Sequence, residues 1–140
     1  MKKTAILFIV LVAAFLGCSK DNVKPSADSL LATGAFSIID HIKDAYEGKD
    51  RKGLKTHMDS SLAESIIKEL SFESVELTFT PRMVKITDSV KVNLKWHGSW
   101  LITKDRKVDN RGVADLIFDR ETMKLTYIDG DNPFVIPAAR

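Results

Sequence analysis

The chain is poor in the residue types that mark several protein classes. It has one cysteine, seven glycines and four prolines among 140 residues. A single thiol excludes an intramolecular disulfide framework and the small zinc modules that need several cysteines. The low glycine and proline content excludes a collagen-like or low-complexity chain. The sequence contains neither a glycine-rich phosphate loop nor a Gly-x-Ser-x-Gly nucleophile motif.

The one long apolar run stands at the start of the chain. Lys2 and Lys3 precede the run Ala5–Leu16, which no polar face interrupts. A membrane-spanning helix needs about 20 apolar residues, so this run is too short to span. A basic segment followed by an apolar run of this length is typical of an export signal. Residues 1–17 are therefore predicted to be a signal peptide.

The only cysteine directly follows this segment. The stretch Phe15-Leu16-Gly17-Cys18 resembles the bacterial lipobox, whose usual form is Leu-Ala/Ser-Gly/Ala-Cys. The resemblance implies cleavage between Gly17 and Cys18, a diacylglyceryl group on the Cys18 thiol, and a fatty acid such as palmitate on the new amino terminus. Ser19, in place of an Asp, implies the outer membrane of a Gram-negative cell, facing the periplasm. The alternative is an ordinary secreted protein with an incidental cysteine.

The rest of the chain divides into a tether and one domain. Residues 18–29 are polar, contain a proline and show no periodicity, so we expect a lipidated tether. The domain is expected over residues 30–140. Apolar side chains at three- and four-residue spacing predict a helix over residues 30–47, ended by Gly48. Two shorter helices are predicted, one over 50–58 with Asp50 as its N-cap, and one from Ser61, where Glu64 completes a capping-box pattern.

From residue 73 the apolar period changes from 3.6 to two, which predicts strands. The predicted strands cover residues 75–79, 84–86, 90–102, 114–118 and 123–128, with a polar loop over 103–111. The strand over 90–102 is unusually long, and Gly98 at its middle predicts a bend or bulge. Helices followed by a run of strands predict an α+β fold, with N-terminal helices packed on a strongly bent antiparallel sheet of about five strands.

This order of elements resembles the nuclear-transport-factor-2-like (NTF2-like) superfamily, a cystatin-like cone fold. The segments that carry the resemblance are Ala45-Tyr46-Glu47-Gly48-Lys49-Asp50 and Tyr127-Ile128-Asp129-Gly130, and it covers residues 30–134. It implies a cone that encloses a pocket between the sheet and the long helix. Some members are isomerases or dehydratases, whereas others bind ligands or proteins. The alternative fold is a cystatin-like or other α+β domain with a single helix layer.

The residues that bear chemistry do not form a catalytic constellation in the sequence. An enzyme of this fold would need an acid–base group in an apolar pocket. The weak candidates are Asp40, His41, Tyr46 and Asp115. Adjacent helical residues such as Asp40 and His41 point about 100° apart, so they do not face one site together. Tyr46, Trp96 and Trp100 are candidates for lining the pocket, and neither a metal site nor a cofactor is predicted.

The charge distribution favours a partner in the cell envelope. The whole chain has a formal charge of +2, but Lys2 and Lys3 belong to the predicted signal, so the chain from residue 18 is formally neutral. Residues 82–111 hold eight basic residues against three acids, a net +5. Export excludes a nucleic-acid role. We therefore expect a lipid-anchored protein that binds a small apolar ligand or an envelope protein, with a lipid-anchored isomerase or dehydratase as the alternative. A structural role in envelope assembly is the third possibility.

Overall fold

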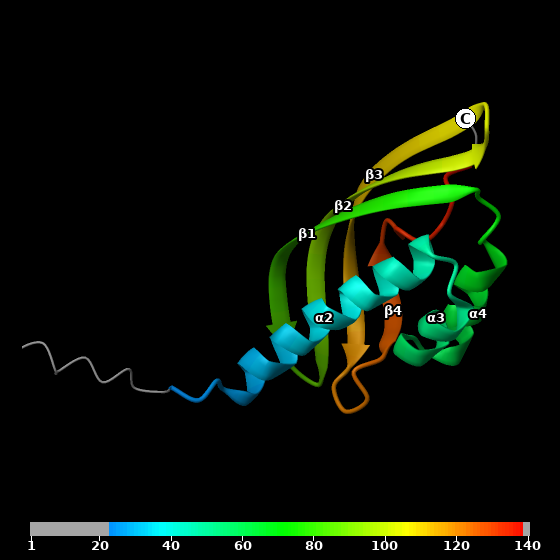
Figure 1. Cartoon of the computed structure of the whole chain (residues 1–140). Helices are drawn as coiled ribbons and strands as arrows, with labels where there is room; N and C mark the ends of the chain where they lie inside the picture. Colours follow the sequence, from blue (N-terminus) through cyan, green and yellow to red (C-terminus); the bar gives the residue numbers. More distant parts are fainter. Residues whose placement is uncertain (1–22, 139–140) are drawn as a thin grey trace, which may run out of the picture.

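A computed structural model describes residues 23–138, which form three helices followed by four strands. In chain order these are α2 (Ala27–Glu47), α3 (Arg51–His57), α4 (Ser60–Lys68), β1 (Ser74–Ile86), β2 (Ser89–Thr103), β3 (Arg106–Asp119) and β4 (Leu125–Gly130). The strands lie in the order β1-β2-β3-β4, and each neighbouring pair is antiparallel. In Figure 1, α2 crosses one face of the curved sheet, and α3 and α4 lie together near the end of α2. The predicted α+β class is confirmed.

The helix boundaries follow from side-chain caps. The hydroxyl oxygen of Ser26 accepts a hydrogen bond from the Ser29 backbone N–H, and α2 begins at Ala27. Its first residues thus lie inside the segment 18–29 that the sequence predicts to be a tether. Gly48 ends α2 as predicted, and the predicted N-cap Asp50 accepts from the Lys52 backbone N–H. These caps satisfy backbone groups that a helix end leaves without partners.

The third helix begins earlier than the sequence predicts. Its N-cap is Asp59 rather than Ser61. Oδ2 of Asp59 accepts hydrogen bonds from the hydroxyl and the backbone N–H of Ser61, at 2.7 and 3.1 Å. These bonds to Ser61 lower the pKa of Asp59, so the carboxylate stays ionised at the positive end of the helix. The acidic cap therefore replaces the predicted capping box.

The sheet has four strands rather than five, because the segments around Pro81 form one strand. From the sequence, Pro81 is expected to end the first strand. Instead, β1 continues through it to Ile86, and its register against β2 shifts between Pro81 and Met83. Because β1 lies at the edge of the sheet, a proline without an N–H costs little there. The irregularity bends the strand without ending it.

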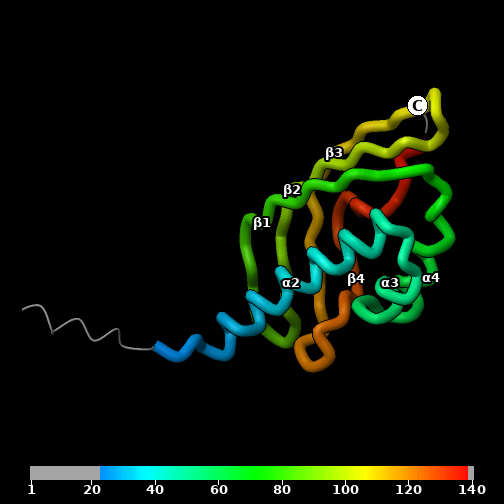
Figure 2. Tube along the Cα trace, in the orientation of Figure 1, coloured from blue at the N-terminus to red at the C-terminus, as the bar shows by residue number. Residues whose placement is uncertain are grey.

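The predicted loop over residues 103–111 is also wrong. Strands β2 and β3 pair as far as Thr103 and Arg106, and a two-residue turn joins them. Most side chains of this stretch are exposed on both faces, so no apolar residue is required at alternate positions. Figure 2 shows this hairpin extending beyond the helices. A strand exposed on both faces carries no period-two signal.

Gly98 does not bulge the long strand. It pairs in register with Leu77, and the register shift of β2 lies instead between Leu101 and Thr103. A Cβ atom at Gly98 would lie 2.6 Å from Cζ3 of Trp100 and 2.8 Å from Cδ2 of Leu77. The glycine is therefore needed because the Trp100 indole packs directly over the backbone.

Gly98→Ala should destabilise the domain by about 1–3 kcal/mol, because the Trp100 ring has to shift in a closely packed core. Gly34→Ala is the matched control. It lies within α2, where a new Cβ would meet only Cε of Met123 at 3.7 Å. Alanine in a helix interior should stabilise the domain by about 0.5–1 kcal/mol. Urea denaturation measures both changes. Equal stabilities for Gly98→Ala and the parent chain would contradict this packing.

Candidate functional site

Aromatic side chains fill the space between the long helix and the sheet. Tyr46 comes from α2, Trp100 from β2 and Phe134 from the segment after β4, and none of the three is exposed to solvent. The Tyr46 ring lies 5.3 Å from the Phe134 ring and 5.2 Å from the Phe72 ring, measured between centroids. The region where the resemblance implies a pocket is therefore occupied by the protein's own core.

Beside the hydrogen bond that Oε1 of Glu47 accepts from the Leu77 backbone N–H at 2.6 Å, a second hydrogen bond joins the helix to the sheet inside this aromatic core. Nε1 of Trp100 donates to the hydroxyl oxygen of Tyr46 at 3.1 Å. Burial raises the pKa of Tyr46 to about 12. The hydrogen bond from Trp100 partly opposes this rise in the pKa, and the negative charge of Glu69 adds to it. Tyr46 is thus a neutral structural residue at physiological pH, with its hydroxyl satisfied by an indole N–H.

Trp96 belongs to the core together with Trp100. The two indoles meet edge to face with centroids 6.3 Å apart, and Nε1 of Trp96 donates to the Asp131 carbonyl oxygen at 2.7 Å. Within residues 23–138, every buried side-chain nitrogen or oxygen has a hydrogen-bond partner. The interior therefore presents no free polar group to a ligand, and the three residues predicted to line a pocket pack against one another or their neighbours.

Asp40 and His41 both lie on the exposed part of α2. His41 stacks on His57 of α3, with ring centroids 5.2 Å apart and an interplanar angle of 19°. Partial burial and the neighbouring His41 lower the pKa of His57. The sequence does not predict that His41 and His57 stack, because their spacing along the chain does not show how α3 folds back on α2. Within residues 23–138 the two imidazoles are not part of any group of three or more possible metal ligands.

Asp115 lies on the outer face of the sheet, away from the helices. It sits between the buried residues Ala114 and Leu116 on β3, so its side chain points to the opposite face. One carboxylate oxygen accepts from Nδ2 of Asn93 at 2.6 Å, and the other lies 3.3 Å from Nζ of Lys91. The bond from Asn93 is the largest cause that lowers the pKa of Asp115. The structure therefore brings none of the four catalytic candidates together.

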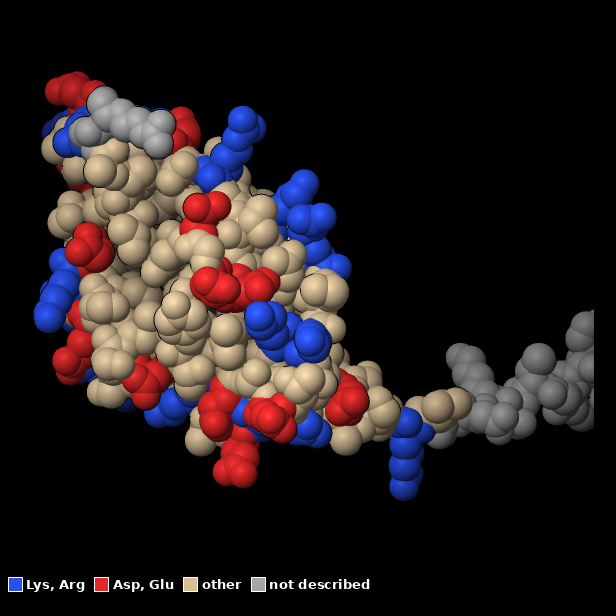
Figure 3. Space-filling view, turned by 180° about the vertical axis from the view of Figure 1, so that it is seen from behind, with Lys and Arg blue, Asp and Glu red and all other residues tan. Residues whose placement is uncertain are grey.

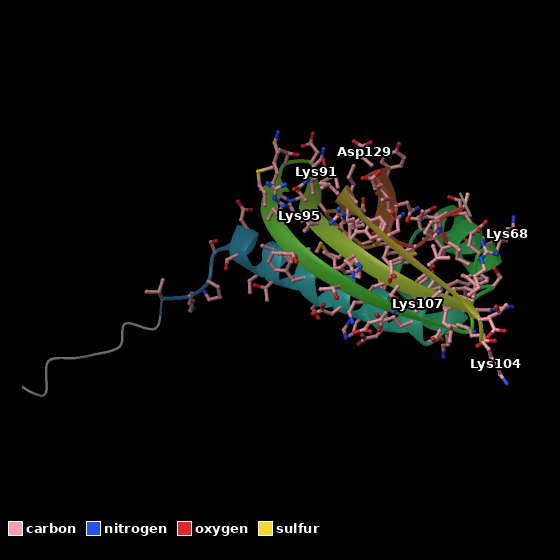
Figure 4. The ribbon with its side chains drawn as sticks, turned by 90° about the horizontal axis from the view of Figure 1, so that it is seen from above. Lys68, Lys91, Lys95, Lys104, Lys107 and Asp129 are labelled. Atoms are coloured by element: carbon pink, nitrogen blue, oxygen red, sulfur yellow. The ribbon has the colours of Figure 1, made fainter. Side chains whose placement is uncertain are left out.

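The basic stretch predicted over residues 82–111 separates into two groups in space. One group lies on the paired part of β1 and β2, and the other lies toward the tip of the β2–β3 hairpin. In Figure 4, Lys91 and Lys95 lie toward the end of the molecule where the chain enters, and Lys104 lies toward the opposite end. Seen from behind, basic side chains gather along one margin, and acidic ones lie near the middle of that face (Figure 3).

The hollows described for residues 23–138 lie at the surface and are lined mostly by residues of polar type. One of about 340 Å³ on the outer face of the hairpin is lined by His97, Asp109, Asn110 and Arg111. Among the described residues no cluster of three or more His, Cys, Asp or Glu is placed to hold a metal ion. No described helix is long and apolar enough to cross a membrane. The predicted cleavage and lipidation residues, Gly17 and Cys18, lie outside the described residues.

Removing the Tyr46 hydroxyl should expose the structural role of this side chain. Tyr46→Phe leaves the Trp100 N–H buried without an acceptor, so it should destabilise the domain by about 1–3 kcal/mol. Tyr127→Phe is the matched control, because Tyr127 is 59% exposed and should lose almost no stability. Urea midpoints of the two variants compare them directly. If both variants matched the parent chain, the hydrogen bond would not contribute to stability.

Comparison with solved structures supports the cone fold. An NTF2-like superfamily protein from Salmonella enterica serovar Typhimurium aligns with a TM-score of 0.59 and 10% sequence identity, covering 81% of this chain and all of that one. TsrD from Streptomyces laurentii aligns with a TM-score of 0.48, 11% identity, and 71% and 89% coverage of the two chains. No family model and no curated protein sequence matches the chain. At this identity the first likeness establishes the fold alone: the domain has an NTF2-like fold.

Proposed function

We propose that this chain is a lipid-anchored bacterial envelope protein whose NTF2-like domain binds an envelope partner at its outer surface. The observation that carries the proposal is the closed interior: Tyr46, Trp100 and Phe134 fill the cone, and among residues 23–138 every buried side-chain nitrogen or oxygen already has a hydrogen-bond partner. A small apolar ligand inside the cone would have to displace these side chains. A protein or surface partner would need only the exposed strands.

The proposed anchor follows from the first residues of the chain. The apolar run Ala5–Leu16 ends in Gly17 and Cys18, in the order that lipoprotein processing requires. Each buried CH₂ group of an acyl chain contributes about 0.8 kcal/mol, so several chains on Cys18 would hold the protein stably on a membrane. Ser19 favours the outer membrane, with the domain in the periplasm. The polar residues up to Ser26 would then serve as the tether.

The enzyme alternative receives less support from the arrangement of its candidate residues. An isomerase or dehydratase needs an acid–base group beside its substrate in an apolar pocket. Asp40 and His41 are exposed on the helix, and Asp115 is paired on the outer face of the sheet. Tyr46 is the one buried candidate, and its hydroxyl is engaged by Trp100. A surface-binding role requires none of these residues to act as an acid or base.

Cys18→Ala tests the anchor. When the parent chain is expressed in a Gram-negative host fed a clickable fatty acid, the protein should carry the label and sediment with membranes. The Cys18→Ala chain should carry no label and accumulate as the longer precursor, because the modified thiol is the signal for cleavage. Ser19→Ala serves as the control and should be labelled and processed like the parent chain. Normal cleavage of Cys18→Ala would overturn the lipoprotein assignment.

A further inference from the structure

The end of the domain where the chain enters is fixed by contacts among three segments. Nη2 of Arg120, in the β3–β4 turn, lies 3.8 Å from a carboxylate oxygen of Asp28 in the first turn of α2. Nη1 of the same arginine donates to the Thr87 carbonyl oxygen, in the β1–β2 turn, at 2.6 Å. The start of α2 and the β1–β2 turn therefore lie at the same end of the molecule, as Figure 1 also shows.

A concentration of basic side chains lies on the outer face of the sheet near this end. Lys85 and Lys91 are direct cross-strand partners, and Lys95 follows on the same face of β2. Like charges placed directly opposite each other repel, and Asp115 offsets the charge of Lys91 but not that of Lys85, which a further anion would stabilise. We call Lys85, Lys91 and Lys95, together with Arg82 at the register shift of β1 beside them, the tether-side basic face.

Most of this charge is not neutralised within the described residues. Lys91 pairs with Asp115, whereas Arg82, Lys85 and Lys95 form no ion pair among residues 23–138. Asp28 pairs with Arg120, and the acids on the same outer face are Asp115 and Asp129, which are direct cross-strand partners of each other, so four basic residues stand against two acids. The tether-side basic face therefore has a local excess of positive charge.

An exposed apolar side chain lies in the middle of this basic surface. Met83 pairs with Asn93, between the Lys85–Lys91 pair and Lys95, and it is 59% exposed. A flexible apolar side chain among lysines suits the boundary between phosphate headgroups and acyl chains of a bilayer. An acidic protein would match the charge but would not account for the position of this face beside the tether.

The length of the tether brings this surface within reach of a membrane. Eight residues lie between Cys18 and Ala27, where α2 begins. At a maximum of about 3.5 Å per residue, they span about 30 Å, so a lipid on Cys18 keeps this end of the domain close to the headgroups. Lysines within a Debye length of an anionic surface are attracted to it.

We infer that the tether-side basic face docks the domain onto the anionic phospholipid headgroups of the membrane that holds its anchor. This inference rests on the proposed lipid anchor and adds an orientation to it. The face of the sheet beside the tether lies against the bilayer, and the β2–β3 hairpin at the far end points away from it. A partner would then meet the hairpin end, where Arg106, Lys107 and Asp109 line an open hollow.

Lysine footprinting of the full processed lipoprotein tests the orientation. The protein is reconstituted into vesicles of phosphatidylcholine, with or without about one third phosphatidylglycerol, and acylated with a water-soluble reagent before mass spectrometry. In the anionic vesicles, labelling of Lys85 and Lys95 should fall several-fold relative to the neutral vesicles, because the attracted headgroups then cover this face. Lys68 and Lys104, at the far end in Figure 4, should be labelled equally in both. High salt should abolish the protection.

Charge reversal supplies a matched pair of variants. Lys85→Glu/Lys95→Glu should remove the protection of Lys91 in anionic vesicles, whereas Lys104→Glu/Lys107→Glu should retain it. All four lysines are exposed, so both variants should fold. If Lys85 and Lys95 were labelled to the same extent in the two vesicle types, whether strongly or weakly, the docking inference would be overturned. Failure of the parent protein to sediment with either vesicle would overturn the lipid anchor instead.

Discussion

The hydrogen bond from Trp100 to Tyr46 is the contact on which the arrangement of the domain depends. It joins residues 54 positions apart, one on the long helix and one on the long strand. Neighbouring residues make room for this hydrogen bond and enclose it. Gly98 leaves room for the Trp100 ring over the strand, and Phe72 and Phe134 enclose the Tyr46 ring. Because a buried polar group without a partner is costly, the two side chains hold the helix in one position on the sheet.

Because the interior is closed, a binding partner would contact the surface of the domain. The NTF2-like fold is compatible with enclosed ligand sites, but a fold does not determine what its members do. In this chain the aromatic core occupies the enclosed volume, and the distinctive chemistry lies on the exposed strands. Basic residues gather beside the proposed tether, and a hollow lined in part by Arg106 and Lys107 lies at the far end. An anchor at one end and an open hairpin at the other would give the domain a defined orientation at a membrane.

The sequence predicted the elements that bury one face and expose the other. It did not predict the strands whose two faces are both exposed. The long helix and the alternation of β2 were visible because apolar residues recur at a fixed spacing on one face, and the Asp50 cap was visible because Asp favours the N-cap position. The stretch over 103–111 is exposed on both faces, so its strands carried no period. The His41–His57 stack and the Lys85–Lys91 pair depend on register and helix packing, which spacing along the chain does not encode. Trp96 and Trp100 were placed on the correct face, but the sequence could not show that Phe134 returns to close the space beside them.

Alkaline titration of Tyr46 tests the closed interior most directly. The chain has two tyrosines, so Tyr127→Phe leaves Tyr46 as the only phenol. Near-ultraviolet absorbance then follows phenolate formation while circular dichroism follows the fold. A buried Tyr46 should form no phenolate until the fold is lost or the pH approaches about 12, which is the raised pKa of its hydroxyl. Phenolate formation around the ordinary value of 10.0, with the fold intact, would show that solvent reaches Tyr46 and would contradict a filled cone.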